Sequence, residues 1–184
     1  MKRYTVIFIL LTGILAGCHR TAPQGPSKRS GMKHKADTTV LTLMEINQRM
    51  AAQADAELLA LVDSLQKADG SEFSQLPTGG WRKRRDAQAR EMAQYANTPG
   101  PGERWCVRMR VYTLQGAFLQ DIEGSYIIKH LDMPIAVEEA VDDMCEGETA
   151  VVYSPWYTAY GMKGNKTIRP YTNVRFDVTL KGKD

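Results

Sequence analysis

Residues that commonly carry metal or nucleophilic chemistry are scarce in this chain of 184 residues, which holds three cysteines and three histidines. The histidines, His19, His34 and His130, stand far apart, and no H-x-x-x-H or C-x-x-C spacing suggests a metal site. A Gly-rich phosphate loop and a G-x-S-x-G nucleophile elbow are also missing. These gaps argue against hydrolase, kinase and nucleotide-binding functions, and we expect neither a metal nor a cofactor.

Cys106 and Cys145 form an even pair once Cys18, which has a different context, is set aside. The sequence does not show whether the Cα atoms of the pair are close enough for a disulfide. The sequence is therefore compatible with a disulfide between Cys106 and Cys145 and also with two free thiols.

The apolar run at the start of the chain, Tyr4 to Ala16, is too short for a membrane-spanning helix, which needs ~20 residues. It follows the charged M-K-R and leads into L-A-G-C at 15–18, which is the order of a secretory signal. L-A-G-C resembles the bacterial lipobox, whose cysteine is lipidated and becomes the first mature residue. The alternative is a signal in which the cysteine stands by chance. We predict a signal peptide over 1–17 and a lipid anchor at Cys18.

Acidic residues are absent from residues 1–35, which contain seven of the 24 basic residues. The rest of the chain therefore has 17 basic and 21 acidic residues, a net charge of −4. The segment 18–40 is rich in Pro, Gly, Ser and basic residues and lacks periodicity, so we predict a flexible tether. A mildly acidic body argues against nucleic-acid binding, and we interpret W-R-K-R-R at 81–85 as a solvated strand edge.

Glycine and proline are absent from Leu41 to Lys67, and the apolar residues there recur at helical spacing. We predict a helix over 41–67, ended by A-D-G-S at 68–71. Its apolar stripe must be buried either against the following domain or against a second copy of the chain, and we favour a homodimer. The stripe consists of Leu43, Ile46, Met50, Ala54, Leu58, Leu61, Val62 and Leu65.

Turn signals divide the chain after this helix. L-P-T-G-G-W at 76–81 predicts a turn into a short strand, and Q-G at 115–116 predicts a hairpin. Residues 86–98 permit a helix, which P-G-P-G at 99–102 would end. Glu-Gly at 146–147 predicts a turn before the strand A-V-V-Y-S-P.

Alternating apolar residues predict strands beside these turns. They are Val107, Met109 and Val111 in one strand, and Val174, Phe176, Val178 and Leu180 in the last one. Between these strands, Asp132 is predicted to cap a short helix that tolerates Pro134 in its first turn. The expected apolar side of this helix is Val137, Ala140, Val141 and Met144, and the expected solvent side is Glu138, Glu139, Asp142 and Asp143. One short helix crossing an antiparallel sheet predicts an α+β domain over 73–184.

The last third of the chain carries an ordered series of motifs: M-C-E-G-E-T-A-V-V-Y-S-P, then A-Y-G, then I-R-P-Y-T-N-V-R-F-D-V-T-L. This series resembles the C-terminal half of the FKBP-type peptidyl-prolyl cis-trans isomerases. Upstream, E-E-A-V-D-D-M and L-Q-G-A-F-L-Q resemble the helix and the hairpin of that family. The order of lipobox, tether, helix, T-G-G-W and domain also resembles the lipoprotein isomerases associated with gliding motility. The resemblance implies a twisted antiparallel sheet wrapped around one short helix, here preceded by the long N-terminal helix.

The resemblance also implies an apolar pocket that twists X-Pro bonds, and it assigns six residues to that pocket. Tyr160 is implied as the edge residue that hydrogen-bonds the substrate carbonyl, and Phe176 as the inward aromatic of the last strand. The other four are Leu119 at the hairpin, Met133 and Val137 at the helix start and pocket floor, and Ile168 at the return of the flap.

Four positions depart from the family pattern. Val137 stands where the pocket floor is usually tryptophan, and Gln120 stands where the hairpin usually has aspartate. Arg169 replaces the first proline of the family's I-P-P. Pro134 lies just before the floor helix, where the family holds its ligand with a backbone N–H that proline does not have.

The resemblance implies an isomerase that acts on unfolded or X-Pro-containing polypeptides and assists the folding of exported proteins. With the lipid anchor, we expect it in the bacterial cell envelope, on the outer membrane and facing the periplasm. The alternative is an FKBP-like chaperone or binding module with little or no isomerase activity, which the departures at Pro134 and Val137 favour. A third reading is an envelope interaction protein on the same fold, because fold alone does not fix function.

Overall fold

The computed structural model describes residues 33–83 and 97–184, and the side chains of residues 42–83 and 97–184. The predicted signal peptide, Cys18, most of the predicted tether and most of the segment 86–98 lie outside the described residues. The chain divides into two compact units, residues 1–42 and 43–184. The second unit contains the sheet, the short helix and the greater part of the long helix, and it is the unit described below.

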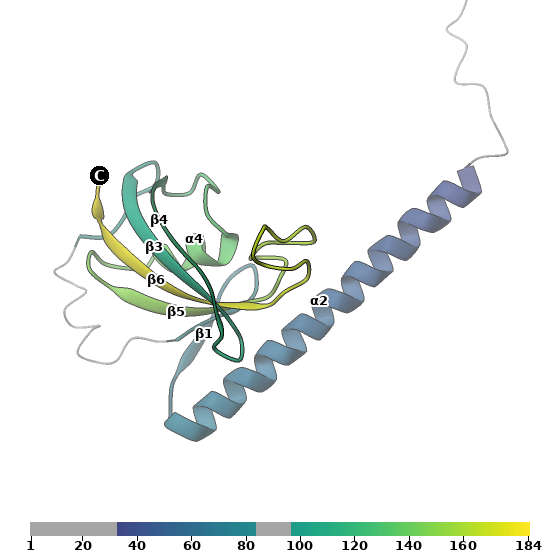
Figure 1. Ribbon diagram of the computed structural model, residues 1–184, viewed down its shortest axis with the longest axis horizontal. Coiled ribbons are helices and arrows are strands. Elements are labelled where there is room, and N and C mark those ends of the chain that lie inside the picture. Colours follow the sequence, from purple (N-terminus) through teal and green to yellow (C-terminus); the bar gives the residue numbers. More distant parts are fainter. Residues whose placement is uncertain (1–32, 84–96) are drawn as a thin grey trace, which may run out of the picture. The chain divides into compact units, whose positions relative to one another are not determined.

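A single sheet of six strands, all paired antiparallel, forms the body of the second unit, in the order β1-β2-β5-β6-β3-β4 (Figure 1). The strands are β1 (Phe73–Gln75), β2 (Trp81–Lys83), β3 (Arg104–Thr113), β4 (Phe118–Ile127), β5 (Thr149–Ser154) and β6 (Val174–Lys183). With one short helix on the sheet and a long helix before it, the predicted α+β fold is confirmed.

The last strand, β6, lies inside the sheet and turns one face entirely into the core. Its alternating apolar residues have no exposed surface, because β3 and β5 flank the strand on both sides. Phe176 lies between Val111 of β3 and Val152 of β5 in the strand register. The periodicity of V-R-F-D-V-T-L therefore predicted both the strand and its buried face correctly, as it did for Val107, Met109 and Val111 of β3.

The short helix α4 (Ile135–Val141) packs on the sheet against β5 and β6 (Figure 1). Its predicted apolar side is confirmed, since Val137, Ala140, Val141 and Met144 are all fully buried. Two details of the prediction are wrong. The N-cap is Pro134 rather than Asp132, and no side chain caps the helix. Glu138, expected in solvent, is buried, and its Oε1 accepts a hydrogen bond from the Leu131 N–H at 3.1 Å.

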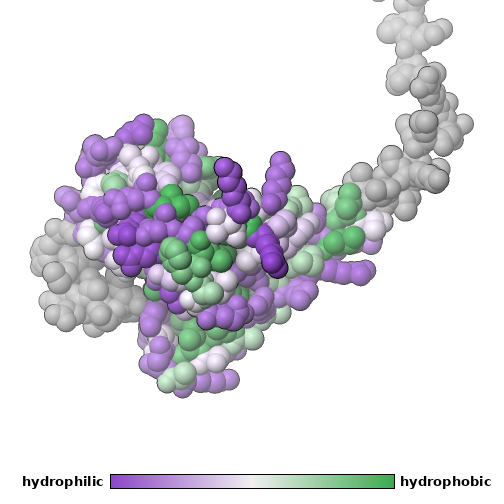
Figure 2. Space-filling view, viewed as in Figure 1, coloured by the Kyte–Doolittle hydropathy of each residue, from purple (hydrophilic) through white to green (hydrophobic). Residues whose placement is uncertain are grey.

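The long helix α2 (Lys33–Asp69) begins eight residues before the predicted start and ends two residues after the predicted end. Leu58 and Val62 are buried in a cluster with Phe73 of β1 and Tyr153 of β5, so this part of the apolar stripe packs on the sheet. Three apolar side chains nearer the start of the helix are exposed, namely Leu43, Met44 and Ile46. Figure 2 shows the resulting apolar surface on α2. The stripe is thus covered by the domain from Ala54 onward, and its start is exposed.

Arg82 corrects the interpretation of W-R-K-R-R as a solvated strand edge. It lies on β2, which is paired on both sides, and its guanidinium is buried in an ion pair with Glu148 at 2.9 Å. Arg82 is buried because β1 and β5 flank β2 on both sides. Arg84 and Arg85 lie outside the described residues.

Two questions that the sequence left open have an answer in the structure. Among the residues that the structure describes, neither Cys106 nor Cys145 forms a disulfide. No helix within residues 33–83 and 97–184 has the length and apolarity needed to cross a membrane.

Candidate active site

The six side chains predicted to form a pocket all lie in the main core cluster or pack against it. Val137, Phe176, Ile168 and Met133 belong to the main core cluster, and Leu119 and Tyr160 are partly buried against it. All six predicted residues therefore belong to the main core or border it, and their role as a pocket stays a prediction.

Different elements supply these side chains. Val137 comes from the first turn of α4, Phe176 from the third residue of β6, and Leu119 from the start of β4. Tyr160 and Ile168 both come from residues 155–173, the connection between β5 and β6. The only polar group among the six side chains, the Tyr160 hydroxyl, is therefore held by a connection rather than by a strand.

The β5–β6 connection is held in shape by backbone hydrogen bonds at its base. The Gly161 N–H donates to the Trp156 carbonyl at 2.7 Å, and the Tyr171 N–H donates to the Gly161 carbonyl at 3.3 Å. The side chain of Asn173 closes the base, because its Oδ1 accepts from the Trp156 N–H at 2.9 Å. These bonds fix the backbone on both sides of Tyr160.

Helix α2 supports the same connection, which the sequence did not reveal. The Tyr157 hydroxyl donates to Asp55 at 2.5 Å, and the Asn173 amide donates to Glu57 at 2.7 Å. Two further bonds run from Trp156 Nε1 to the Met50 carbonyl and from the Tyr171 hydroxyl to Asn47, at 3.3 and 3.0 Å. Trp156 and Tyr171 also pack edge to face, with ring centroids 4.8 Å apart. In Figure 1 the connection (yellow-green) lies beside α2.

The Tyr160 hydroxyl lies at the edge of the apolar cluster. Its ring packs beside Phe176, with centroids 6.0 Å apart, and its oxygen accepts a hydrogen bond from Gln120 Nε2 at 2.5 Å. Burial raises the pKa of Tyr160 to about 12, against the opposing effect of the Gln120 hydrogen bond. The phenol is therefore protonated at neutral pH and able to donate a hydrogen bond.

The start of α4 borders the same cluster and has few backbone donors left for a ligand. Pro134 has no N–H, and its carbonyl accepts from the N–H groups of Val137 and Glu138. The Ala136 N–H donates to the Thr158 carbonyl at 3.2 Å, which ties α4 to the β5–β6 connection. A ligand at this point would depend on the Tyr160 hydroxyl more than on the helix.

An apolar cluster with one protonated hydroxyl at its edge suits the family that the sequence resembles, and a direct comparison agrees. Residues 120–181 match the family model described as FKBP-type peptidyl-prolyl cis-trans isomerase. The chain contains an FKBP-type isomerase domain. No curated protein sequence matches the chain at a significant level.

Solved structures with the FKBP fold resemble the whole of this domain. A peptidyl-prolyl cis-trans isomerase from Pseudomonas syringae superposes with a TM-score of 0.52 at 16% identity, covering 73% of this chain and 96% of that one. FkpA from Escherichia coli superposes with a TM-score of 0.53 at 14% identity, covering 100% of this chain and 83% of that one. At this level of identity, the likeness shows the fold.

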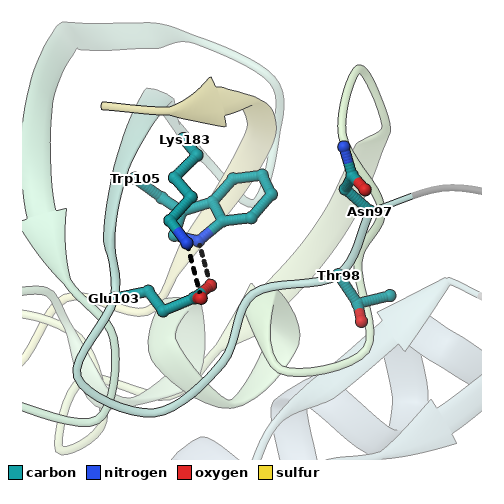
Figure 3. A pocket seen from close by; sticks show the side chains of 5 residues that line it. All are labelled: Asn97, Thr98, Glu103, Trp105 and Lys183. Atoms are coloured by element: carbon teal, nitrogen blue, oxygen red, sulfur yellow. Dashed lines mark hydrogen bonds and ion pairs between the residues drawn. The ribbon is translucent and has the colours of Figure 1, made fainter.

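A polar hollow of about 450 Å³ lies on the FKBP-type domain (Figure 3). It is lined by Asn97, Thr98, Glu103, Trp105 and Lys183. Glu103 is already satisfied there by Lys183 at 2.7 Å and by the Trp105 indole N–H at 3.0 Å. Trp105 lies six positions before Val111, which pairs with Phe176, a distance of about 20 Å along the strand. Trp105 also belongs to the main core cluster, but the polar hollow lies at the opposite end of β3 from Val111 and Phe176.

The described residues provide no alternative centre for metal chemistry. Within residues 33–83 and 97–184, no group of three or more His, Cys, Asp or Glu side chains is placed to hold a metal ion.

Proposed function

We propose that the chain is a membrane-anchored peptidyl-prolyl cis-trans isomerase that assists the folding of exported proteins. The observation that carries the proposal is the Tyr160 hydroxyl, protonated and partly buried, at the edge of an apolar wall formed with Phe176. The FKBP-type domain over residues 120–181 supports the same reaction.

The proposed reaction requires neither a nucleophile nor a metal. An X-Pro bond isomerises slowly because amide resonance is lost as the bond twists. An apolar surface favours the less polar twisted amide over both planar forms, so it binds the transition state better than the substrate. Val137, Ile168 and Phe176 would form the buried floor beneath that surface, and the partly buried Leu119 and Tyr160 would contact the substrate. Tyr160 would also donate a hydrogen bond to the substrate carbonyl.

Unfolded polypeptides are the substrate class we propose. Three large apolar side chains close in sequence to the pocket residues are exposed, namely Phe118, Ile135 and Met162. Phe118 and Ile135 adjoin Leu119 and Pro134 along the chain, and Met162 lies two residues after Tyr160. These three side chains offer apolar contacts for the residues that flank a substrate proline. An unfolded chain exposes such apolar residues, whereas a folded protein exposes few in a row.

A chaperone with little isomerase activity is the second candidate, and a specific observation favours it. Pro134 removes a backbone donor at the pocket, and the fully buried Val137 gives a smaller floor than tryptophan would. The two candidates differ in how they act on a client whose refolding is limited by an X-Pro bond. An isomerase raises the rate of the slow phase at substoichiometric amounts, whereas a chaperone raises the yield only near equimolar amounts.

We test the proposal in that refolding assay, with Tyr160→Phe as the control. The expected result is a faster slow phase with the wild type and a smaller acceleration with Tyr160→Phe. A higher yield at an unchanged rate would favour the chaperone instead.

The anchor and the location form a separate part of the proposal. We propose that Cys18 is lipidated and holds the domain on the periplasmic side of the outer membrane, since L-A-G-C resembles a lipobox. The order of lipobox, tether, helix and domain resembles the gliding-motility lipoprotein isomerases, and we propose that subtype. Metabolic labelling with a fatty acid should mark the wild type but not Cys18→Ser. An unlabelled, soluble wild type would refute the anchor.

We also propose that the start of α2 mediates homodimer formation. Leu43, Met44 and Ile46 are exposed on a helix whose later turns are covered by the domain. A second copy of the same helix could bury them. Sedimentation should find a dimer for the wild type and a monomer for a variant with Leu43, Met44 and Ile46 all changed to Gln. A monomeric wild type would contradict this part.

A further inference from the structure

Asn165, in the β5–β6 connection, has its side-chain amide held in one orientation. Its Oδ1 accepts hydrogen bonds from the backbone N–H groups of Thr167 and Ile168, at 2.8 and 2.7 Å. A backbone N–H can only donate, so the atom that faces these two groups must be the amide oxygen. The amide nitrogen of Asn165 therefore points away from them.

The fixed amide of Asn165 determines the orientation of Gln120. Asn165 Nδ2 lies 3.3 Å from Gln120 Oε1 and donates to it. Because Nδ2 has no lone pair to accept with, Gln120 must present its oxygen to Asn165 and its nitrogen to the other side. That nitrogen, Nε2, donates to the Tyr160 hydroxyl at 2.5 Å.

The direction of donation leaves the Tyr160 proton unused. Tyr160 accepts from Gln120, and its hydroxyl makes no other hydrogen bond within the described residues. A phenol has one proton, and this proton is free for an acceptor outside the protein. The chain of donors runs from the backbone through Asn165 and Gln120 to Tyr160 and ends at the proposed position of the substrate carbonyl.

We propose that Asn165 and Gln120 are positioning residues that make Tyr160 a hydrogen-bond donor toward the substrate. The inference rests on the proposed isomerase function and identifies Asn165 and Gln120 as the residues that orient the Tyr160 hydroxyl toward the substrate. Without the fixed amide of Asn165, Gln120 could turn its oxygen toward Tyr160. It would then accept the hydrogen bond that Tyr160 would otherwise donate to the substrate carbonyl. The glutamine in place of the usual hairpin aspartate is then a functional feature, because an aspartate carboxylate can only accept.

Gly164 helps to hold Asn165 in place. Its φ of +61° is a conformation that other residues rarely adopt, and a Cβ at this position would collide with the Ile168 carbonyl oxygen. The Asn165 N–H donates to the same carbonyl at 2.8 Å. The turn from Gly164 to Ile168 thus presents Asn165 toward Gln120.

Asn165→Asp replaces the amide nitrogen by an oxygen and thereby reverses the direction of the hydrogen bonds that link residue 165, Gln120 and Tyr160. The aspartate still accepts from Thr167 and Ile168, but its second oxygen cannot donate to Gln120. Gln120 then turns its nitrogen toward Asp and its oxygen toward Tyr160, which donates its proton to Gln120. Gln120→Glu is a second variant with the same consequence, because a carboxylate accepts from both neighbours. Lys166→Gln is the matched control, since it changes the net charge by the same −1 at the adjacent exposed position.

We would measure kcat/KM on an X-Pro peptide for these variants, both alone and combined with Tyr160→Phe. Asn165→Asp and Gln120→Glu should each lower kcat/KM to the level of Tyr160→Phe, a loss of up to about tenfold. In the Tyr160→Phe background they should cause no further loss, and Lys166→Gln should have no effect. An equal loss in both backgrounds, or no loss in either, would overturn the proposal.

A spectroscopic readout separates this inference from the proposed function. With tyrosine labelled with carbon-13 at the hydroxyl-bearing carbon, the Tyr160 signal is the one that Tyr160→Phe removes. In Asn165→Asp the carbon-13 chemical shift of this signal should move toward the value of a phenolate, because the hydroxyl now donates to Gln120. In Lys166→Gln the chemical shift should stay at the wild-type value. An inactive wild type with this shift would refute the isomerase and keep the donor chain. An active wild type without the shift would refute the donor chain alone.

Discussion

Tyr160 illustrates how burial sets the role of a single residue. Removal of its ring from water raises the pKa of the hydroxyl to about 12, because the charged phenolate is disfavoured in an apolar environment. The hydroxyl therefore stays protonated over the whole physiological range. Because Gln120 donates to its oxygen, the role we propose for the hydroxyl is to donate its own proton to a bound polypeptide.

Tyr160→Phe should lower activity without loss of stability. The substitution removes one neutral hydrogen bond, worth about 0.5–1.5 kcal/mol, which corresponds to up to about tenfold in kcat/KM. The ring and its contact with Phe176 remain, so the midpoint of denaturant unfolding should stay close to that of the wild type. A complete loss of activity would mean that the hydroxyl does more than donate one hydrogen bond.

Phe176→Ala should destabilise the whole domain. The side chain has no exposed surface, and its removal leaves a cavity that costs roughly 3–5 kcal/mol in the free energy of unfolding. Phe118→Ala is the matched control, because Phe118 is 59% exposed and its loss should cost no more than about 0.5 kcal/mol. Urea unfolding of both variants measures the difference, and equal costs would contradict the burial of Phe176.

Pro134→Ile should raise turnover if the missing backbone N–H limits the pocket. Pro134 is the N-cap of α4, where a residue with an N–H gains a donor that no helical bond requires. Pro101→Ile, in an exposed turn, serves as the control for proline removal as such. Peptide isomerisation rates that stay at the wild-type level in both variants would show that the N–H is not limiting.

At the scale of elements, α2 is more than a spacer before the domain. Its residues 47–57 hydrogen-bond to the base of the β5–β6 connection, and Leu58 and Val62 pack against β1 and β5. The helix therefore supports the connection that carries Tyr160. A truncated chain without residues 41–67 would lose both the packing and these hydrogen bonds.

Leu58→Ala should show that α2 belongs to the fold of the domain. Leu58 is 1% exposed, so the substitution should cost about 2–5 kcal/mol in the free energy of unfolding. Its neighbour Leu59 is 47% exposed, and Leu59→Ala should change stability by no more than about 0.5 kcal/mol. Hydrogen exchange in residues 155–173 should also accelerate in Leu58→Ala alone. Equal stability of the two variants would mean that the helix folds apart from the sheet.

Periodicity explains which elements the sequence predicted well. β3, β6 and the apolar side of α4 each bury one face, and one buried face leaves a repeat of two or of 3.6 residues in the sequence. The apolar stripe of α2 was readable for the same reason. A repeat shows that a face is buried but not what covers it, so the packing of Leu58 on β1 and β5 was not predictable.

The candidate site was predictable only as far as its motifs reach. The six side chains named from the resemblance all belong to the main core cluster or pack against it, because they lie on regular elements or in recognisable motifs. Their role as a pocket stays a prediction. The contact between Gln120 and Asn165 joins residues 45 positions apart through polar side chains, which leave no periodic signal. The burial of Glu138 was missed because its partner, the Leu131 N–H, lies in an irregular segment.

At the scale of the whole molecule, Glu103 and Lys183 join the start of β3 to the end of β6. Hydrogen bonds from Lys183, the Gly100 N–H and Trp105 lower the pKa of Glu103 to about 2 from its usual value of 4.5. A lowered folded-state pKa means that the contribution of Glu103 to stability is present above pH 4.5 and is lost as the pH falls toward 2.

Glu103→Gln should therefore be less stable than the wild type at neutral pH, and the difference should vanish near pH 2. Thermal unfolding of both proteins across this range measures the effect. A difference that stays constant with pH would show that the ionised carboxylate is not its source.

Charge is distributed unevenly along the chain. Residues 1–35 contain seven basic residues and no acidic ones, whereas the rest carries a net charge of −4. A basic segment next to a lipid anchor would be attracted to anionic lipids, and the acidic body would be repelled from them. This division suits a domain held near a membrane but free to meet unfolded chains.

The central claim is that the apolar pocket edged by Tyr160 catalyses the rotation of X-Pro bonds. The most direct test is the rate of cis-to-trans isomerisation of a short Xaa-Pro peptide, measured in a protease-coupled assay with purified wild-type protein and Tyr160→Phe. We predict a rate that rises linearly with wild-type concentration, and a slope up to about tenfold smaller for Tyr160→Phe. A rate that stays at the uncatalysed value with the folded wild-type protein, on peptides with different residues before proline, would contradict the account.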